Sequence, residues 1–342
     1  MVNKSPKYNL YRLITFVILG ALVCFAATAT VLFYWPQNDI DTKVKINIPN
    51  GSTLTQISDI LYENEVVTNK QMFIISTRLM GYSNKIPAGI FALKNAKNNH
   101  SIVKQLVNNN QAMIRVTLLE GWTIKEVAGV LSESLDLSSE IISSLCYDEL
   151  FIEELGIDAS SIEGYLYPDT YLFLEIEKDP KEILKQIVNE FNKVFDDNLK
   201  NRAQQVGFTV NQTLTMASII EGEAIFDSER NIISAVYHNR INKRMLLQAD
   251  PTVQYIIDDG PRRLTLSDLK IDSPYNTYLY RGLPPGPINN PGRSSIIAAL
   301  YPDDSDYLFF VARGDGYHTF TRNIDEHNRA KREFQKVRQM AR

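Results

Sequence analysis

A long apolar segment near the N-terminus is the clearest feature of the hydrophobic pattern. Residues 13–35 form a run of 23 positions without a charged side chain. At about 1.5 Å per residue, a helix of this length crosses a hydrocarbon core of about 30 Å. We therefore predict a single transmembrane helix over residues 13–35.

The residues that flank this segment predict its orientation. More basic groups precede it than follow it: Lys4, Lys7 and Arg12 on one side, Lys43 and Lys45 on the other. Basic residues concentrate on the cytoplasmic side of membrane helices, so we expect residues 1–12 to be a cytoplasmic tail and the rest of the chain to be extracytoplasmic. A cleaved signal peptide is the alternative, but its apolar core usually spans only about 7–15 residues.

Two similar segments follow, each with a strand-like start, a glycine and then helix-like apolar spacing. They are INIPNGSTLTQISDILYEN, residues 46–64, and VTLLEGWTIKEVAGVLSES, residues 116–134. Each has a threonine two positions after its glycine, where a helix N-cap is expected. We predict small α/β modules over residues 40–155 that resemble LysM-like folds, which hold amino-sugar chains. The alternative is that the apolar stripes simply form a core.

The remainder of the chain, residues 160–342, has mixed periodicity. Residues 180–205 predict one amphipathic helix, and two more helices follow it. Segments between 247 and 295 are dense in Pro, Gly, Asn and Tyr, which predicts long loops with fixed turns. A hairpin around Gly314-Asp315-Gly316 and a charged helix are expected at the end. The expected fold class is α+β: one membrane helix, LysM-like modules, and a mixed α/β domain with long Pro/Gly-rich loops.

Composition and charge exclude several functional classes. The 342 residues carry a formal net charge of -4 and no basic stripe, so no nucleic-acid partner is expected. Cys24 lies in the apolar run and Cys146 in a distant acidic region, so we expect no disulfide between them. The four histidines lack metal-ligand spacing and the glycine motifs of nucleotide-binding loops do not occur, so we expect neither metal nor cofactor.

Two glutamates, Glu221 and Glu223, stand in the otherwise apolar or small run TMASIIEGEAIF. On a helical wheel Glu223 falls in the middle of the apolar stripe, whereas Glu221 falls about 160° away on a face of smaller residues. Burial disfavours the charged form, so we expect Glu223 to be the more desolvated carboxyl group, with a raised pKa, as a general acid requires. The alternative is that the helix ends near Gly222 and that both glutamates cap it or pair with arginines such as Arg230 or Arg240.

Blocks of sequence in the second half resemble those of the endolytic murein transglycosylases, the MltG or YceG-like proteins. The matching blocks are EGYLYPDTY (163–171), MASIIEGEA (216–224), SER (228–230), NRI (239–241), LQADPTV (247–253), SPYNTY (273–278), GLPPGPI (282–288), NPG (290–292) and HTF (318–320). The membrane helix and the LysM-like region also fit, so the resemblance covers nearly the whole chain. Departures are small: Ile241 stands where the family often has leucine, and Lys243-Arg244 where it often has a glycine nearby.

The resemblance implies that Glu223, the second glutamate of the E-x-E pair, is the catalytic residue of a membrane-anchored lytic transglycosylase. It implies cleavage of the β-1,4 bond between N-acetylmuramic acid and N-acetylglucosamine within nascent peptidoglycan strands, which leaves a 1,6-anhydro end and stops strand elongation. One carboxyl group can protonate the leaving oxygen and then, as carboxylate, take the proton of the C6 hydroxyl. The implied partners are peptidoglycan strands and penicillin-binding synthases at the outer face of the cell membrane, without a cofactor.

Further residues of these blocks suit a saccharide site. Tyrosine rings stack on sugars, and neutral amides form hydrogen bonds with hydroxyl groups. The candidates for substrate binding are Gln248, Asp250, Tyr275, Asn276, Tyr278, Asn239 and Glu221. Asp250 belongs to an Asp-Pro-Thr turn signature, so a structural role is its alternative. Glu221 points to nearly the opposite face from Glu223.

Two other functions stand as alternatives. A non-catalytic scaffold would bind glycan or synthases, but it has no need of a carboxyl group on an apolar stripe. A hydrolytic muramidase would need a second, well-placed carboxylate and a water molecule. The chemical nature of the glycan products distinguishes these functions.

Overall fold

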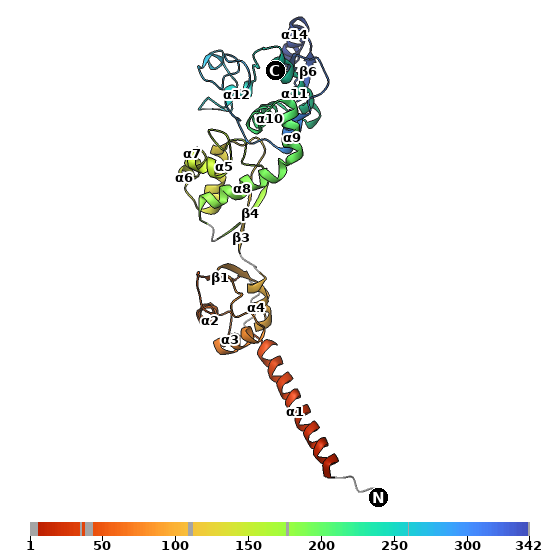
Figure 1. Ribbon diagram of the computed structural model, residues 1–342. Helices are drawn as coiled ribbons and strands as arrows, with labels where there is room; N and C mark the ends of the chain where they lie inside the picture. Colours follow the sequence, from red (N-terminus) through yellow and green to blue (C-terminus); the bar gives the residue numbers. More distant parts are fainter. Residues whose placement is uncertain are drawn as a thin grey trace. The chain divides into compact units, whose positions relative to one another are not determined.

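The computed structural model describes residues 6–34, 36–37, 44–108, 112–175, 178–258 and 260–340 (Figure 1). Two compact units divide the chain: Met1–Ile114 with Leu174–Ile176, and Arg115–Phe173 with Glu177–Arg342. The segment 116–134 therefore belongs to the second unit, whereas its counterpart 46–64 belongs to the first. The boundary expected between residues 155 and 160 does not separate the two units, because contacts rather than sequence similarity hold a unit together.

Helix α1, Pro6–Tyr34, contains the apolar segment. Its residues Leu13–Tyr34 form a stretch of 22 residues that is long and apolar enough to cross a membrane, and 0% of its most apolar window is buried. The helix begins before residue 13, and proline is favoured in a first turn. The predicted helix is thus confirmed as far as Tyr34. Several flanking residues lie outside the described part of the chain: Lys4, Trp35, Lys43 and the side chains of Lys7 and Arg12.

The first unit continues with a small α/β module. Its described elements are β1 (Val44–Ile48), α2 (Leu54–Glu63), α3 (Lys70–Leu79), β2 (Gly89–Leu93) and α4 (Asn99–Val107). β1 and β2 pair antiparallel, with Ile46 opposite Phe91. Gly51 has a left-handed φ of +76°, which favours glycine, and Thr53 then forms a capping box on α2. The strand, glycine turn and capped helix predicted for residues 46–64 are confirmed.

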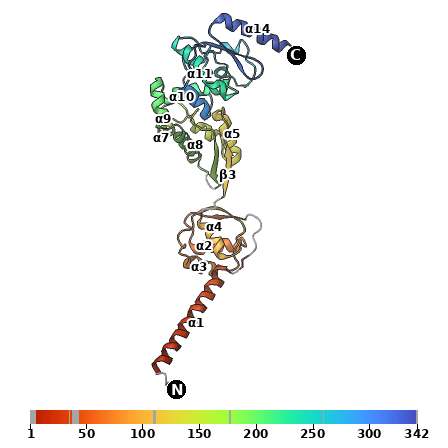
Figure 2. The same ribbon diagram turned by 90° about the vertical axis from the view of Figure 1, so that its right-hand side faces the viewer.

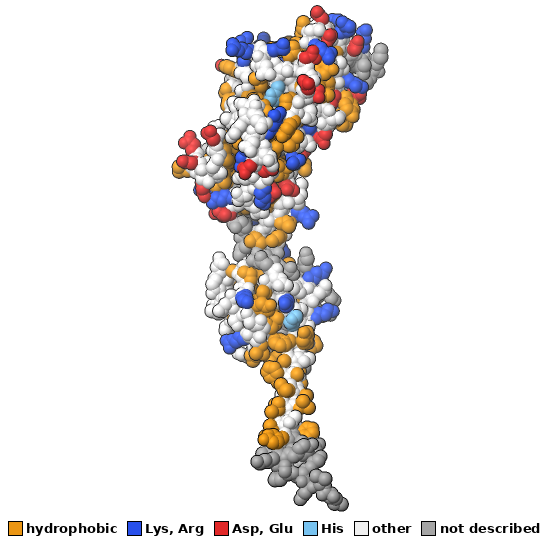
Figure 3. Space-filling view, turned by 45° about the vertical axis from the view of Figure 1, so that its right-hand side comes forward, with side chains coloured by type: hydrophobic (Ala, Val, Ile, Leu, Met, Phe, Trp, Pro, Cys, Tyr) orange, Lys and Arg blue, Asp and Glu red, His pale blue; other side chains and the backbone are white. Residues whose placement is uncertain are grey.

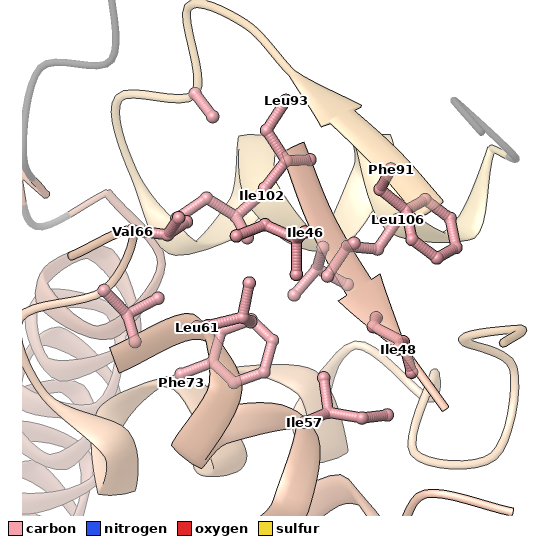
Figure 4. Close-up of a cluster of buried hydrophobic side chains, with 13 residues drawn as sticks. Ile46, Ile48, Ile57, Leu61, Val66, Phe73, Phe91, Leu93, Ile102 and Leu106 are labelled. Atoms are coloured by element: carbon pink, nitrogen blue, oxygen red, sulfur yellow. The ribbon is translucent and has the colours of Figure 1, made fainter. Parts of the chain in front are cut away.

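The core of this module lies between the strand pair and the helices (Figure 4). Ile46 and Ile48 of β1 and Phe91 and Leu93 of β2 are buried, because alternate side chains of a strand point to the same face. Leu61 of α2 and apolar residues of α3 and α4 pack against them. Every residue of this core that the structure describes belongs to the first unit.

The second unit is mainly helical (Figure 2). Strand β3 (Met113–Thr117) pairs with β4 (Thr170–Leu174), and β5 (Phe309–Ala312) pairs antiparallel with β6 (His318–Thr321). The helices are α5 (Ile124–Leu135), α6 (Ser139–Leu145), α7 (Glu149–Glu154), α8 (Pro180–Val194), α9 (Asp197–Val206), α10 (Val210–Glu223), α11 (Asp227–Asn242), α12 (Asp250–Gln254), the 3-10 turn η1 (Asp268–Lys270), α13 (Arg293–Leu300) and α14 (Ile324–Met340). The capped helix after residue 116, the final hairpin and the last helix are confirmed.

One helix prediction is wrong in its extent. Residues 180–205 form two helices, α8 and α9, because the chain leaves the helical conformation at Phe195. The side chain of Asp196 then accepts a hydrogen bond from the backbone N–H of Leu199 and starts the next helix. The apolar spacing continues across this break, so it did not reveal the boundary.

Helix α10 lies at the centre of the second unit. It packs against α11, α12 and α13, and every residue from Thr213 to Ile220 is buried. For α10 the helical wheel predicted one apolar stripe and one face of smaller residues. In the structure, other parts of the protein bury both faces. Residues 271–292 carry neither helix nor strand, and parts of this segment cover the smaller face: Ser218 accepts the N–H of Ile288 and its carbonyl accepts the amide of Asn289.

Candidate functional site

The carboxyl group of Glu223 lies at the last residue of α10, where the helix meets α11. The next residues, Ala224 and Phe226, have extended backbone conformations that lead into α11. The side chain of Tyr237 on α11 is fully buried, and its hydroxyl donates a 2.8 Å hydrogen bond to Oε1 of Glu223. This bond fixes one of the two carboxyl oxygens of Glu223.

The surroundings of Glu223 change its proton affinity. Burial raises the pKa of Glu223 to about 7, and the negative charge of Asp250 acts in the same direction. The hydrogen bond from Tyr237 and the positive charge of Arg240 lower this pKa in part. The raised pKa expected from the wheel is confirmed. A carboxyl group that is partly protonated near neutral pH can serve as a general acid and, once ionised, as a base.

Glu221 has a different environment. Its side chain is only 8% exposed, so Glu223 is not the only desolvated carboxyl group of the pair. Oε1 of Glu221 forms an ion pair of 3.2 Å with Nη1 of Arg230, and Oε2 accepts the N–H of Gly292 at 3.0 Å. Because both oxygens are engaged inside the protein, the structure assigns Glu221 to holding α10, α11 and α13 rather than to binding substrate.

Three of the predicted substrate-binding residues lie around Glu223. Arg240 donates to the carbonyl oxygen of Leu247 and, at 3.4 Å, to Oε1 of Gln248. The hydroxyl of Tyr278 donates to Oδ1 of Asp250, whose charge acts on Glu223.

These side chains differ from Glu221 in their access to solvent. Gln248 and Asp250 are exposed and Tyr278 is half-buried. Asp250 and Arg240 act electrostatically on Glu223, and Tyr278 and Gln248 are hydrogen-bonded to these two residues.

The other predicted contacts interact with groups of the protein itself. Asn276 is fully buried; its amide donates to the carbonyl oxygens of Leu269 and Ile271, and its own carbonyl accepts the N–H of Tyr278. Asn276 therefore shapes the loop that presents Tyr278.

Asn239 and Tyr275 also make contacts within the protein. The amide of Asn239 donates to the carbonyl oxygens of Ser305 and Tyr307. The ring of Tyr275 is half-buried and lies 5.1 Å from the ring of Tyr255. Neither side chain shares a hydrogen bond or ring contact with the cluster around Glu223 in the described part of the chain.

A glycine between the two glutamates brings α12 close to the acid. A Cβ atom on Gly222 would lie 2.6 Å from Cβ of Pro251, far inside normal contact distance. Only glycine therefore allows the Asp250-Pro251 corner to pack on the end of α10. This contact gives a physical reason for the small residue in the E-G-E sequence.

Sequence reasoning missed two residues of this region. Tyr237 belongs to the predicted helix through residues 229–241, but a partner fourteen positions from Glu223 on another helix is not visible in a local pattern. Glu163 lies in the block EGYLYPDTY and is almost fully buried; burial raises its pKa to about 8. Its carboxyl group accepts the N–H of Ile124 and the amide of Asn290, so it joins α5 to the segment before α13.

The residues around Glu223 do not include a metal-ligand set. Among the residues that the structure describes, no group of three or more His, Cys, Asp or Glu side chains is arranged to hold a metal ion.

Comparisons with known proteins identify a family. The model of the YceG-like family matches residues 46–333. A Bacillus subtilis protein named endolytic murein transglycosylase is 34% identical over 313 residues, which cover 87% of this chain and 86% of that protein. A Streptococcus pneumoniae protein of the same name is 27% identical over 84% of this chain, and the match spans 57% of that longer protein.

A solved structure shows the same architecture. The crystal structure of a YceG-like protein from Listeria monocytogenes superposes with a TM-score of 0.60 and is 32% identical. The match covers 84% of this chain and 99% of the Listeria chain. The mixed α/β fold is thus shared with a solved relative.

Proposed function

We propose that this chain, which belongs to the YceG-like family, is an endolytic murein transglycosylase that cleaves the glycan strands of peptidoglycan. The observation that carries the chemistry is the half-buried Glu223, with a pKa raised to about 7 and one oxygen held by Tyr237. The names of the relatives from Bacillus subtilis and Streptococcus pneumoniae support the same activity.

Glu223 acts as the single proton donor and acceptor of the reaction. Its protonated carboxyl group gives its proton to the glycosidic oxygen as the bond from that oxygen to C1 of N-acetylmuramic acid breaks. The resulting carboxylate then takes the proton of the C6 hydroxyl as O6 bonds to C1, and the 1,6-anhydro ring closes. Glu223 regains its proton and no water is consumed. The 2-acetamido oxygen of the substrate stabilises the positive charge that develops at C1.

The exposed polar groups around Glu223 contact the sugar rings. Gln248 and Asp250 form hydrogen bonds with hydroxyl and acetamido groups of the sugars. The ring of Tyr278 packs against the face of a sugar ring. The stacked rings of Phe226 and Tyr317, 4.2 Å apart, provide a second aromatic surface three residues after the acid. These assignments extend the family's activity to named contacts in this chain.

A hydrolytic reaction is the competing function, and one residue favours it. Glu221 cannot supply the second carboxylate, because Arg230 and Gly292 occupy its oxygens. Asp250 is close enough for its charge to raise the pKa of Glu223, so it is the carboxylate that would activate a water molecule. Its bond from Tyr278 favours a positioning role instead.

The proposal also includes a location and partners. Helix α1 anchors the protein in the cell membrane with residues 1–12 in the cytoplasm, and the α/β module and the second unit lie outside the cytoplasm. The α/β module between β1 and α4 acts as a LysM-like module that holds a glycan strand. The enzyme works beside penicillin-binding synthases, where cleavage ends the elongation of a nascent strand.

Mass spectrometry of the products from purified, uncrosslinked glycan strands tests the activity. Transglycosylation predicts fragments that end in 1,6-anhydro-N-acetylmuramic acid and whose masses sum to that of the substrate. Fragments that carry one added water would show a muramidase and overturn the proposal. Intact strands after long incubation would show a scaffold. Strands treated with a known hydrolytic muramidase provide the mass reference for the water-adding reaction.

A further inference from the structure

The end of α1 is attached directly to the module that follows it. The carbonyl oxygen of Leu32 accepts hydrogen bonds from the hydroxyl of Ser76 on α3, at 2.9 Å, and from the amide of Asn99 on α4, at 3.0 Å. The ring of Tyr34 stacks on the ring of His100, with centroids 5.6 Å apart. These contacts fix α3 and α4 to the last turn of α1.

This attachment sets the depth of α3 relative to a membrane that α1 crosses. The apolar segment Leu13–Tyr34 is about 33 Å long as a helix, close to the hydrocarbon thickness of about 30 Å. Leu32 lies two residues, or about 3 Å, before the end of this segment. Tyr34 is 56% exposed, and exposed tyrosines favour the level of the lipid headgroups. Since Ser76 bonds to Leu32, α3 lies where hydrocarbon gives way to headgroups.

Helix α3 exposes large apolar side chains at this depth. Ile75 is 41% and Leu79 is 57% exposed, and they stand one helical turn apart on the same face. On the wheel Leu79 is about 60° and Ile75 about 100° from Ser76, so both flank the surface that contacts α1. Apolar side chains in this position lose contact with water if they enter a bilayer.

The charge of the module fits an anionic lipid surface. Residues 44–108 contain seven basic and three acidic side chains, although the whole chain has a formal net charge of -4. Figure 3 shows Lys and Arg side chains distributed over this module and the apolar surface of α1 below it. Basic groups near a bilayer are attracted to anionic headgroups.

We propose that Ile75 and Leu79 of α3 form a membrane-docking surface that inserts into the interface of a phospholipid bilayer containing anionic lipid. The proposal rests on the anchoring of α1 that forms part of the proposed function, and it adds that the module is seated on the bilayer instead of tethered above it. Because α3 is hydrogen-bonded to the last turn of α1, a bilayer that α1 crosses also reaches α3. We therefore infer that the bilayer, and not a second copy of the chain, covers this surface.

Lipid quenching of a fluorophore tests this proposal in the full chain, reconstituted as one copy per nanodisc with brominated lipids. The environment-sensitive label NBD is attached to cysteine at three positions. The native Cys24, in the middle of α1, reports whether α1 is inserted; Cys146 is fully buried and does not take the label. In a Cys24→Ser background, Leu79→Cys reports docking. Asn47→Cys is the matched control within the module: residue 47 is exposed on β1, a strand that lies away from α1 in Figure 1.

Docking predicts strong quenching at position 79, several-fold above that at position 47 and comparable with that at Cys24. Equal, weak quenching at positions 79 and 47, together with strong quenching at Cys24, would overturn the docking surface while leaving the anchor intact. Weak quenching at all three positions would remove the anchor and the docking surface together. Neither of these results would affect the catalytic assignment, since the product assay measures it separately.

Discussion

Two carboxyl groups two positions apart in the chain have different direct partners inside the protein. Glu221 shares its buried site with the guanidinium of Arg230, which lies 3.2 Å from its Oε1. Glu223 has a neutral hydroxyl, that of Tyr237, as its direct partner, so burial raises its pKa to about 7. The neighbouring residue therefore distinguishes the two glutamates: Glu221 has a charged partner, and Glu223, the proposed acid, has a neutral one.

Removal of the tyrosine hydroxyl is expected to shift the pH dependence of cleavage. The hydroxyl stabilises ionised Glu223, so Tyr237→Phe should raise the pKa of the acid further. Because the acid must be protonated to donate, the fall of kcat/KM at alkaline pH should move upward by about one pH unit, the equivalent of about 1.4 kcal/mol. A pH profile of glycan cleavage measures this shift. A slower enzyme with an unchanged profile would contradict the positioning role, and Tyr62→Phe, on α2, is the control.

The buried ion pair should stabilise the second unit only while both partners are present. Glu221→Gln leaves the guanidinium of Arg230 with one buried partner fewer, and we expect a loss of about 3–5 kcal/mol in the free energy of unfolding. The double variant Glu221→Gln, Arg230→Met should lose less than the sum of the single variants. Urea unfolding measures all three. An unchanged midpoint in the single variant would mean that Glu221 has no structural role.

At the level of elements, the site is assembled where the end of α10 meets α12. Gly222 allows Pro251 to approach, and the short helix α12 then places Asp250 beside the acid. Arg240 of α11 holds the chain before α12 through the carbonyl oxygen of Leu247. Glu223 therefore comes from the end of α10, and Asp250 comes from α12. The chain that leads into α12 is held by Arg240 of α11.

A methyl group at position 222 should separate these elements. Gly222→Ala places a Cβ where only 2.6 Å is available to Pro251, so α12 must move away from Glu223. We expect the cleavage rate to fall by about tenfold or more, because small displacements at an active site are costly. Gly129→Ala on α5 is the matched control, since nothing lies within 4 Å of its added Cβ. That control should keep full activity and gain up to about 1 kcal/mol of stability.

Local features were predictable from the sequence, and long-range contacts were not. The apolar helix, the glycine turns with Thr53 and Thr123 as caps, and the final hairpin depend on neighbouring residues, and each was found where its pattern predicted it. The burial of α10 on both faces and the internal hydrogen bonds of Asn276 depend on segments more distant in the chain. Asn276 was interpreted as a sugar ligand because a neutral amide in a loop has the same local signature in both roles.

At the scale of the whole molecule, catalysis and stability are linked through pH. The folded protein keeps Glu223 protonated up to a pH of about 7, whereas the unfolded chain ionises it near its ordinary value of 4.5. This group therefore contributes stability below pH 4.5 that is lost as the pH rises through about 7. An enzyme of this kind is less stable at the pH where its acid becomes ionised.

Comparison of the wild type with Glu223→Gln isolates this effect from other titrating groups. Glutamine cannot ionise, so the variant should become more stable than the wild type as the pH increases. The difference in unfolding free energy should change by up to about 1.4 kcal/mol per pH unit between pH 5 and 7. Urea unfolding at several pH values measures it. A difference that stays constant with pH would mean that the pKa of Glu223 is the same in the folded and unfolded states.

The cleavage rate of Glu223→Gln on purified glycan strands tests the central claim most directly. A general acid contributes about 10²–10⁴-fold to a rate, and here the same group is also the base, so we predict a loss of at least that size with the fold retained. Glu149→Gln, at the exposed start of α7, should cleave like the wild type. Release of anhydro-ended fragments by Glu223→Gln at the wild-type rate would contradict the account.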